Sequence, residues 1–116
     1  MDDTNTQPRK SCVRREVTYD IFANLVWPKI RKGFEDYHPS LVWMEIISFI
    51  KGSYESLVQT SGCLSRDDYI EQGQKKAPNF TGKREQIYDI FLKYRHFTRQ
   101  RFWFDEADVV NDIFHR

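Results

Sequence analysis

The sequence LVWMEIISFI, at residues 41–50, contains eight apolar residues out of ten. On a helical projection only Glu45 and Ser48 form a narrow polar strip, so the rest of the surface needs cover from other helices. The stretch is too short to cross a bilayer, which takes about 20 apolar residues. Pro39 suits the first turn of such a helix, and Gly52 suits a left-handed cap at its end. We therefore expect a buried core helix with other helices packed around it.

Length and composition indicate one domain with enough apolar residues to form a compact core. The chain has 116 residues, 40% of them hydrophobic, with nine Phe, six Tyr and three Trp. A chain of this size buries about 65% of its unfolded surface. Cys12 and Cys63 lack the spacing of a metal site or a disulfide framework, which favours a reducing compartment. Since no segment resembles a signal peptide or a membrane span, we predict an intracellular protein without membrane contact.

Two kinds of region are expected along the chain: a disordered tail at residues 1–16 and a helical domain at residues 17–116. Thr18 is a good cap for a first helix, which Pro28 should kink or stop near Trp27. One more helical turn is expected at residues 53–58. A short helix should follow Ser65 and stop at Gly73, and residues 75–80 read as a basic connector.

The C-terminal third predicts two further helices. Thr81 can cap a long helix that reaches Arg101, with one apolar face. Asp105 can cap a last helix, whose buried stripe should consist of Val109, Val110, Ile113 and Phe114. Because no segment alternates like a strand, we predict an all-α fold, a compact orthogonal bundle of four main helices and one or two short ones.

The tetrad Asp105-Glu106-Ala107-Asp108 spells the magnesium-binding box of DEAD-box helicases. In that role the carboxylates work beside a phosphate-binding loop of the form GxxxxGK(S/T), which this sequence lacks. Asp105 and Asp108 also occupy the N-cap and third position of a helix, where carboxylates accept from free amides. We therefore interpret the tetrad as a helix cap.

The predicted long helix carries an excess of positive charge. Residues 83–101 contain six bases and two acids, whereas the whole chain has a net charge of only +1. Arginines interleaved with an aromatic ring suit a phosphate backbone with stacked bases. One alternative is a solvated helix face, or bases that complement nearby acids such as Asp105, Glu106, Asp108 and Asp112. For Arg84 and Tyr88 a further alternative is packing against a neighbouring helix. The candidate nucleic-acid-binding residues are Lys75, Lys76, Arg84, Tyr88, Arg95 and Arg99.

No catalytic or metal-binding constellation is found in the sequence. His38, His96 and His115 are far apart and are not paired with a serine or cysteine motif. Each suits a cap or a surface position better than a general base or a ligand. We expect no catalytic residue, no cofactor and no small-molecule substrate for this chain.

A resemblance to a known family extends over nearly the whole chain from about residue 17. The motifs that carry it are YDIF at 19–22, VWPK at 26–29, PSLVWMEI at 39–46, SFIKGS at 48–53, KAPNF at 76–80 and FDEADV at 104–109. Through these motifs the chain resembles a segment of the TPR and ankyrin repeat-containing proteins, a family of large UvrD-like helicase relatives.

The resemblance implies a helical accessory subdomain of the first motor domain of an ATP-dependent helicase. Its partners would be single-stranded nucleic acid and the adjacent motor domains, with ATP and magnesium bound only by those motor domains. Because the phosphate loop is missing, we expect this chain alone neither to bind nor to hydrolyse ATP. The second hypothesis is a helical protein–protein interaction or scaffold domain, which has kept the fold without the motor.

Overall fold

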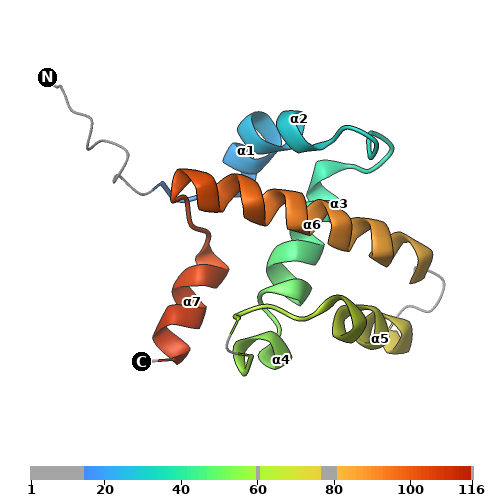
Figure 1. Cartoon of the computed structure of the whole chain (residues 1–116), viewed down its shortest axis with the longest axis vertical. Coiled ribbons are helices and arrows are strands. Elements are labelled where there is room, and N and C mark those ends of the chain that lie inside the picture. The colour runs from blue at the N-terminus through green and yellow to red at the C-terminus, as the bar shows by residue number, and fades with distance from the viewer. Residues whose placement is uncertain (1–14, 60, 77–80, 116) are drawn as a thin grey trace, which may run out of the picture.

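Helix α6 (Thr81–Arg101) runs across the domain, with helices on both sides of it in the view of Figure 1. The computed structural model describes residues 15–59, 61–76 and 81–115. Within these ranges all regular secondary structure is helical apart from one isolated bridge, which confirms the predicted all-α fold. The predicted disordered tail falls, except for its last two residues, outside the described residues.

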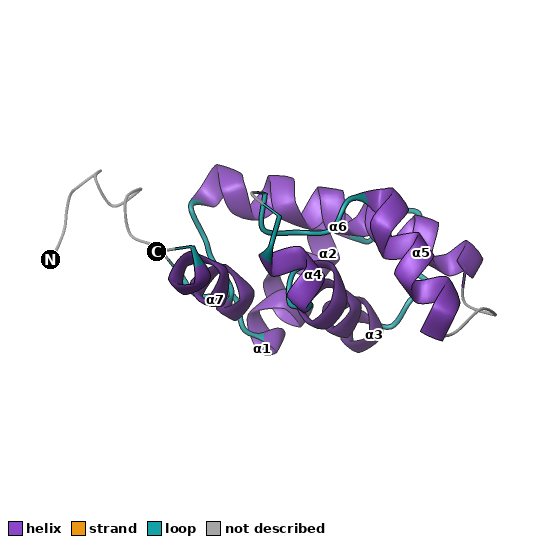
Figure 2. Ribbon diagram, turned by 90° about the horizontal axis from the view of Figure 1, so that it is seen from below, coloured by secondary structure: helices purple, strands orange, loops and turns teal. Residues whose placement is uncertain are grey.

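The other helices lie on two faces and at both ends of the molecule. Figure 2 shows α6 on one face and α3 on the opposite face, with α7 at one end and α5 at the other. The elements other than α6 are α1 (Tyr19–Ile21), a π-helical segment (Phe22–Val26), α2 (Trp27–Ile30), α3 (Pro39–Met44), a second π-helical segment (Glu45–Ile50), α4 (Tyr54–Leu57), α5 (Arg66–Lys76) and α7 (Glu106–Phe114).

The first helical region passes Pro28 instead of stopping at it. A proline ring inside a helix clashes with the carbonyl group four residues earlier. Here the segment directly before Pro28 is π-helical, and the Trp27 amide donates to the Phe22 carbonyl five residues back. This wider turn makes room for the ring, as π-bulges do in α-helices. The helix therefore reaches Ile30, so of the two predicted effects of Pro28, a kink or a stop near Trp27, the stop is wrong.

The central stretch forms the buried helix that its composition predicts. Pro39 occupies the first turn of α3, and the His38 ring caps it by accepting from the Ser40 amide. Val42, Ile46 and Ile50 are fully buried. These side chains join a core to which α1, α2, α5 and α6 also contribute.

Gly52 does not form the predicted left-handed cap. Among the glycines of the described residues, only Gly33 and Gly62 have positive φ angles. A Cβ atom on Gly52 would overlap the carbonyl oxygen of Ile47. The residue is therefore needed for close backbone packing where the π-helical segment ends, which is a different reason from the predicted one.

Glu45, predicted on a polar strip, is buried inside the bundle. Its side chain is 4% exposed and accepts a hydrogen bond from the hydroxyl of Tyr69 on α5. The guanidinium carbon of Arg84, on α6, lies 5.9 Å from the centroid of the Tyr69 ring. These three side chains place a polar cluster where the second π-helical segment, α5 and α6 meet.

Gly73 explains why α5 continues beyond its predicted end. A Cβ atom at this position would overlap the side chain of Arg84. The glycine thus gives space to a buried guanidinium in mid-helix and does not terminate the helix. Consequently α5 continues to Lys76, and Lys75 and Lys76 belong to its last turn, not to a connector. The remainder of the predicted connector, residues 77–80, lies outside the described residues.

Replacement of Gly73 by alanine is expected to lower the free energy of unfolding by about 1 to 3 kcal/mol, because the new methyl group displaces Arg84. Helix propensity alone predicts the opposite sign, a gain of about 1 kcal/mol. Urea denaturation of the variant, beside Gln74→Ala at the exposed neighbouring position, distinguishes the two effects. Stabilisation of the Gly73→Ala variant would contradict the packing of Arg84 against α5.

Candidate docking cleft

A cleft of about 670 Å³ lies between the C-terminal half of α6 and helix α7. One wall belongs to α6 and carries two arginines, and the opposite wall belongs to α7. Residues 61–63 and the α6–α7 connection complete the cleft. The lining includes Cys63, Phe91, Arg95, Arg99, Trp103, Val109, Asp112 and Ile113.

Asp105 fixes the start of α7, and therefore the position of the second wall. Its Oδ1 atom accepts from the Asp108 amide at 2.9 Å, and the Asp108 carboxylate accepts from the Asp105 amide at 2.9 Å. This reciprocal pair is a capping box, and it confirms the predicted role of both residues. In the described part of the chain, no group of three or more Asp, Glu, His or Cys side chains is arranged to hold a metal ion.

The same carboxylate ties α7 to the core. Asp105 is 1% exposed, and its Oδ2 atom accepts from Lys51 Nζ at 2.7 Å and from the Tyr94 hydroxyl at 2.7 Å. Lys51 also binds Asp108 Oδ1 at 2.8 Å. Burial raises the pKa of the Tyr94 hydroxyl, and the adjacent Asp105 carboxylate raises it further. The sequence predicted the cap, but it gave no signal for Lys51 or Tyr94 as partners.

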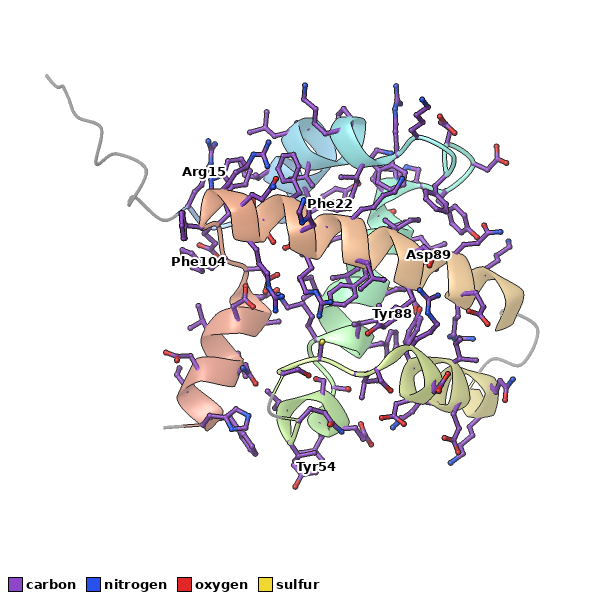
Figure 3. All side chains as sticks on the ribbon, viewed as in Figure 1. Arg15, Phe22, Tyr54, Tyr88, Asp89 and Phe104 are labelled. Carbon is purple, nitrogen blue, oxygen red and sulfur yellow. The ribbon has the colours of Figure 1, made fainter. Side chains whose placement is uncertain are left out.

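The connection between α6 and α7 is held by the N-terminal segment. The Val17 amide donates to the Phe104 carbonyl at 2.6 Å, and the Phe104 amide donates to the Arg15 carbonyl at 2.9 Å. Figure 3 shows Arg15 and Phe104 together at the C-terminal end of α6. Arg15 and Glu16, predicted to belong to the disordered tail, are therefore part of the folded domain.

The apolar stripe of α7 is exposed, which corrects the prediction that it is buried. Val109, Val110, Ile113 and Phe114 are 44%, 51%, 60% and 47% exposed, respectively. Ala107 is the one hydrophobic residue of α7 that is buried. The sequence pattern located the stripe correctly, but the described helices do not cover it. We call these four residues the α7 stripe.

The far end of α7 lies close to Gly62 in the loop before α5 and contacts Leu57 at the end of α4. A Cβ atom on Gly62 would lie 2.7 Å from Asn111 Nδ2, so the glycine allows α7 to approach that loop. His115 Nε2 lies 2.7 Å from the carbonyl oxygen of Leu57. Helix α7 is thus anchored at its start by Asp105 and at its end by these contacts, while its apolar side chains remain accessible.

The structure divides the predicted nucleic-acid-binding residues into two groups. Arg95 and Arg99 both line the cleft. Arg84 and Tyr88 are each 6% exposed, and the Tyr88 hydroxyl donates to the Leu64 carbonyl at 2.6 Å. Figure 3 shows Tyr88 on the side of α6 that faces α5. For these two residues the alternative prediction, packing against a neighbouring helix, describes the structure.

The two lysines of the predicted set lie elsewhere. Lys75 is exposed near the end of α5 and does not line the cleft. Lys76 belongs to the last turn of the same helix, and its side chain is outside the described residues. The cleft instead includes residues that were not predicted as a site, notably Cys63 and Trp103. Neither residue belongs to a motif that could be singled out in the sequence, and only the fold brings the two to the same cleft.

Comparisons with known proteins show a similarity to a segment of a large human protein. No family model matches the chain. No solved structure matches it either. The human protein TPR and ankyrin repeat-containing protein 1 is 43% identical to the chain over 100 residues, which is 86% of this chain and 3% of that protein. In the described ranges, no helix has the length and apolar character needed to cross a membrane.

The identity with this relative supports the repeat-protein part of the resemblance seen in the sequence motifs. It gives no support to the UvrD-like helicase part. The chain spans about 3% of the length of the relative that it matches. The chain is therefore similar, over most of its own length, to one short segment of a large TPR and ankyrin repeat-containing protein.

Proposed function

We propose that this chain is a helical protein-interaction domain, and that the cleft between α6 and α7 docks an amphipathic helix of a partner protein. The observation that carries the proposal is the α7 stripe, whose four side chains are 44% to 60% exposed. Apolar residues scattered singly on a surface need no explanation, but a contiguous row beside a cleft is typical of an interaction site.

The lining of the cleft suits a helix with two kinds of side chain. Val109 and Ile113, one turn apart on α7, offer apolar contact, and the half-buried Trp103 extends it. Amphipathic helices bind such grooves through apolar residues spaced three and four positions apart. Arg95 and Arg99 provide the polar margin opposite the α7 stripe. The lining thus combines apolar side chains with arginines, as protein interfaces commonly do.

The relative with 43% identity adds independent support. Its name describes TPR and ankyrin repeats, which are helical units whose stacked surfaces commonly bind proteins. A helical domain within such a protein fits a role in protein assembly. Only this class of function, protein interaction, is carried over from the relative to this chain. The proposal itself rests on the exposed α7 stripe.

The competing function is contact with single-stranded nucleic acid as a helicase accessory module. With Arg84 and Tyr88 buried, the side chains described as accessible from the predicted set are Lys75, Arg95 and Arg99. Lys75 lies on α5 and the two arginines line the cleft on α6. A nucleic-acid strand that contacted all three side chains would therefore have to extend from the cleft to α5. The tests below include this function as an outcome.

The docking proposal predicts saturable binding of a designed peptide of about 18 residues, which is long enough for a stable helix. The peptide carries leucines at helical spacing on one face, and it is titrated into ¹⁵N-labelled protein. Chemical shifts should change at the α7 stripe and Trp103. The double variant Val109→Ser/Ile113→Ser should weaken binding by about tenfold or more, as expected for central apolar contacts.

The matched control replaces exposed apolar residues outside the cleft. Leu25 and Met44 are 42% and 47% exposed, similar to Val109. The double variant Leu25→Ser/Met44→Ser should bind the peptide as the unmodified protein does. Equal losses in the two double variants, or shift changes spread over α1 and α3, would overturn docking in the cleft.

A further inference from the structure

We infer that the partner helix carries two carboxylates one helical turn apart, which Arg95 and Arg99 bind while the apolar side chains contact the α7 stripe. This inference rests on the docking proposed above and adds the chemistry of the partner. It also gives a function to two predicted site residues that the fold keeps accessible.

The two arginines form a pair with the spacing of one helical turn. Arg95 and Arg99 are four residues apart on α6, so both side chains project from the same face of the helix. Both line the cleft, as do Val109 and Ile113 of the α7 stripe. A single helix lying in the cleft can therefore contact both arginines and the stripe.

Arg95 is held in place by its neighbours before any partner binds. Its guanidinium carbon lies 5.4 Å from the centroid of the Phe91 ring, and its Nη1 atom lies 3.8 Å from Cys63 Sγ. Neither contact neutralises the charge. A cation stacked on an aromatic ring keeps its hydrogen-bond donors available at the edge of the guanidinium plane. Pre-positioning of this kind reduces the entropy lost when a carboxylate binds.

The charges around the cleft leave the arginine pair in excess. The ion pairs among the described residues join Lys51 to Asp105 and Asp108, and Arg66 to Glu85 and Asp89; none includes Arg95 or Arg99. The other basic residue of the cleft, Lys51, is thus already paired with acids. Asp112 on α7 is the one further acid in the lining, so two guanidinium groups face one carboxylate.

Carboxylates are the groups that this arrangement recognises best. The planar guanidinium presents parallel N–H donors that match the two oxygens of a carboxylate. Two glutamates four residues apart on a partner helix have nearly the same spacing as Arg95 and Arg99 on α6. Phosphates of single-stranded nucleic acid share part of this chemistry, but they do not use the apolar side chains of Val109 and Ile113, which line the opposite wall of the cleft.

The test compares three peptides with the same leucine face and with a pair of Glu, Gln or Lys residues beside it, four positions apart. Each is titrated into the full chain by fluorescence anisotropy at two salt concentrations. The Glu peptide should bind about fivefold more tightly than the Gln peptide, and this preference should shrink at higher salt. The Lys peptide should bind most weakly, since like charges then face each other.

Protein variants assign the preference to the two arginines. Arg99→Gln and Arg95→Gln should each reduce the advantage of the Glu peptide over the Gln peptide, and the double variant should remove it. Binding of the Gln peptide serves as the internal control for folding. Lys75→Gln removes an exposed charge outside the cleft and should leave the preference unchanged.

Each further outcome has a distinct meaning. Equal binding of the Glu and Gln peptides would overturn the inference and leave docking on the α7 stripe standing. Failure of all three peptides to bind would overturn both proposals. A short single-stranded nucleic acid that does not bind at all leaves both proposals standing. If it binds more tightly than the Glu peptide, and if Lys75→Gln and Arg99→Gln each weaken that binding, the nucleic-acid function replaces both proposals.

Discussion

Replacement of Asp105 by alanine is expected to lower the free energy of unfolding by about 3 to 5 kcal/mol, the range seen when one partner of a buried charge pair is removed. The carboxylate accepts from the Asp108 amide, Lys51 and Tyr94 while being 1% exposed. Its loss would leave the Lys51 ammonium with Asp108 alone and the Tyr94 hydroxyl without its acceptor. Urea denaturation followed by circular dichroism measures the change.

The matched control for this experiment is Glu106→Ala. Glu106 is exposed in the first turn of α7, where a carboxylate contributes about 0.3 to 1 kcal/mol through the helix dipole. Asp105→Asn gives a second comparison, because the amide oxygen can still cap the helix while the charge is lost. A loss of only about 1 kcal/mol for Asp105→Ala would show that the residue acts as a cap and nothing more.

Alkaline pH is expected to destabilise the protein steeply. Burial raises the pKa of Tyr69 and of Tyr94 above the ordinary tyrosine value, and the Glu45 and Asp105 carboxylates reinforce the two shifts. In the unfolded chain both hydroxyls lose their protons above about pH 10. The folded state retains those protons, so its stability is complete below that pH and declines above it. Two such groups give a slope of up to about 2.7 kcal/mol per pH unit.

Phenylalanine variants isolate the contribution of each tyrosine. Tyr94→Phe should reduce the alkaline slope by about 1.4 kcal/mol per pH unit, because one titrating group is removed. Tyr54 is 69% exposed and points away from α4 (Figure 3), so Tyr54→Phe should leave the slope unchanged. Denaturant midpoints measured from pH 8 upward give these slopes. An unchanged slope in Tyr94→Phe would contradict burial of a protonated hydroxyl against Asp105.

Local signals in the sequence predicted the helix starts well. Thr18, Ser65 and Asp105 each accept the backbone hydrogen bond expected of a cap. Such bonds involve residues three positions apart, so a single sequence contains the information that they need. The apolar face of α6 was also located correctly, since Ile87, Ile90, Phe91 and Tyr94 are all buried.

Features that depend on distant partners could not be predicted in this way. Gly73 resembles a helix stop until the side chain of Arg84 is found against it. Pro28 resembles a helix break in the sequence, but the π-helical segment before it accommodates the proline ring. The α7 stripe resembles a buried face, because periodicity identifies an apolar side but not the surface that covers it. The cleft itself depends on the angle between α6 and α7, which Asp105 sets through Lys51 and Tyr94 from other helices.

Docking in the α6–α7 cleft is tested most directly by isotope-filtered NOE measurements on the labelled protein with the Glu peptide. Contacts are expected between the peptide leucine methyl groups and the methyl groups of Val109 and Ile113, with the Trp103 indole ring nearby. The peptide glutamates should at the same time shift the side-chain signals of Arg95 and Arg99. Leucine contacts confined to Tyr54, Met44 or Leu25, with no contact to α7, would contradict the proposed function.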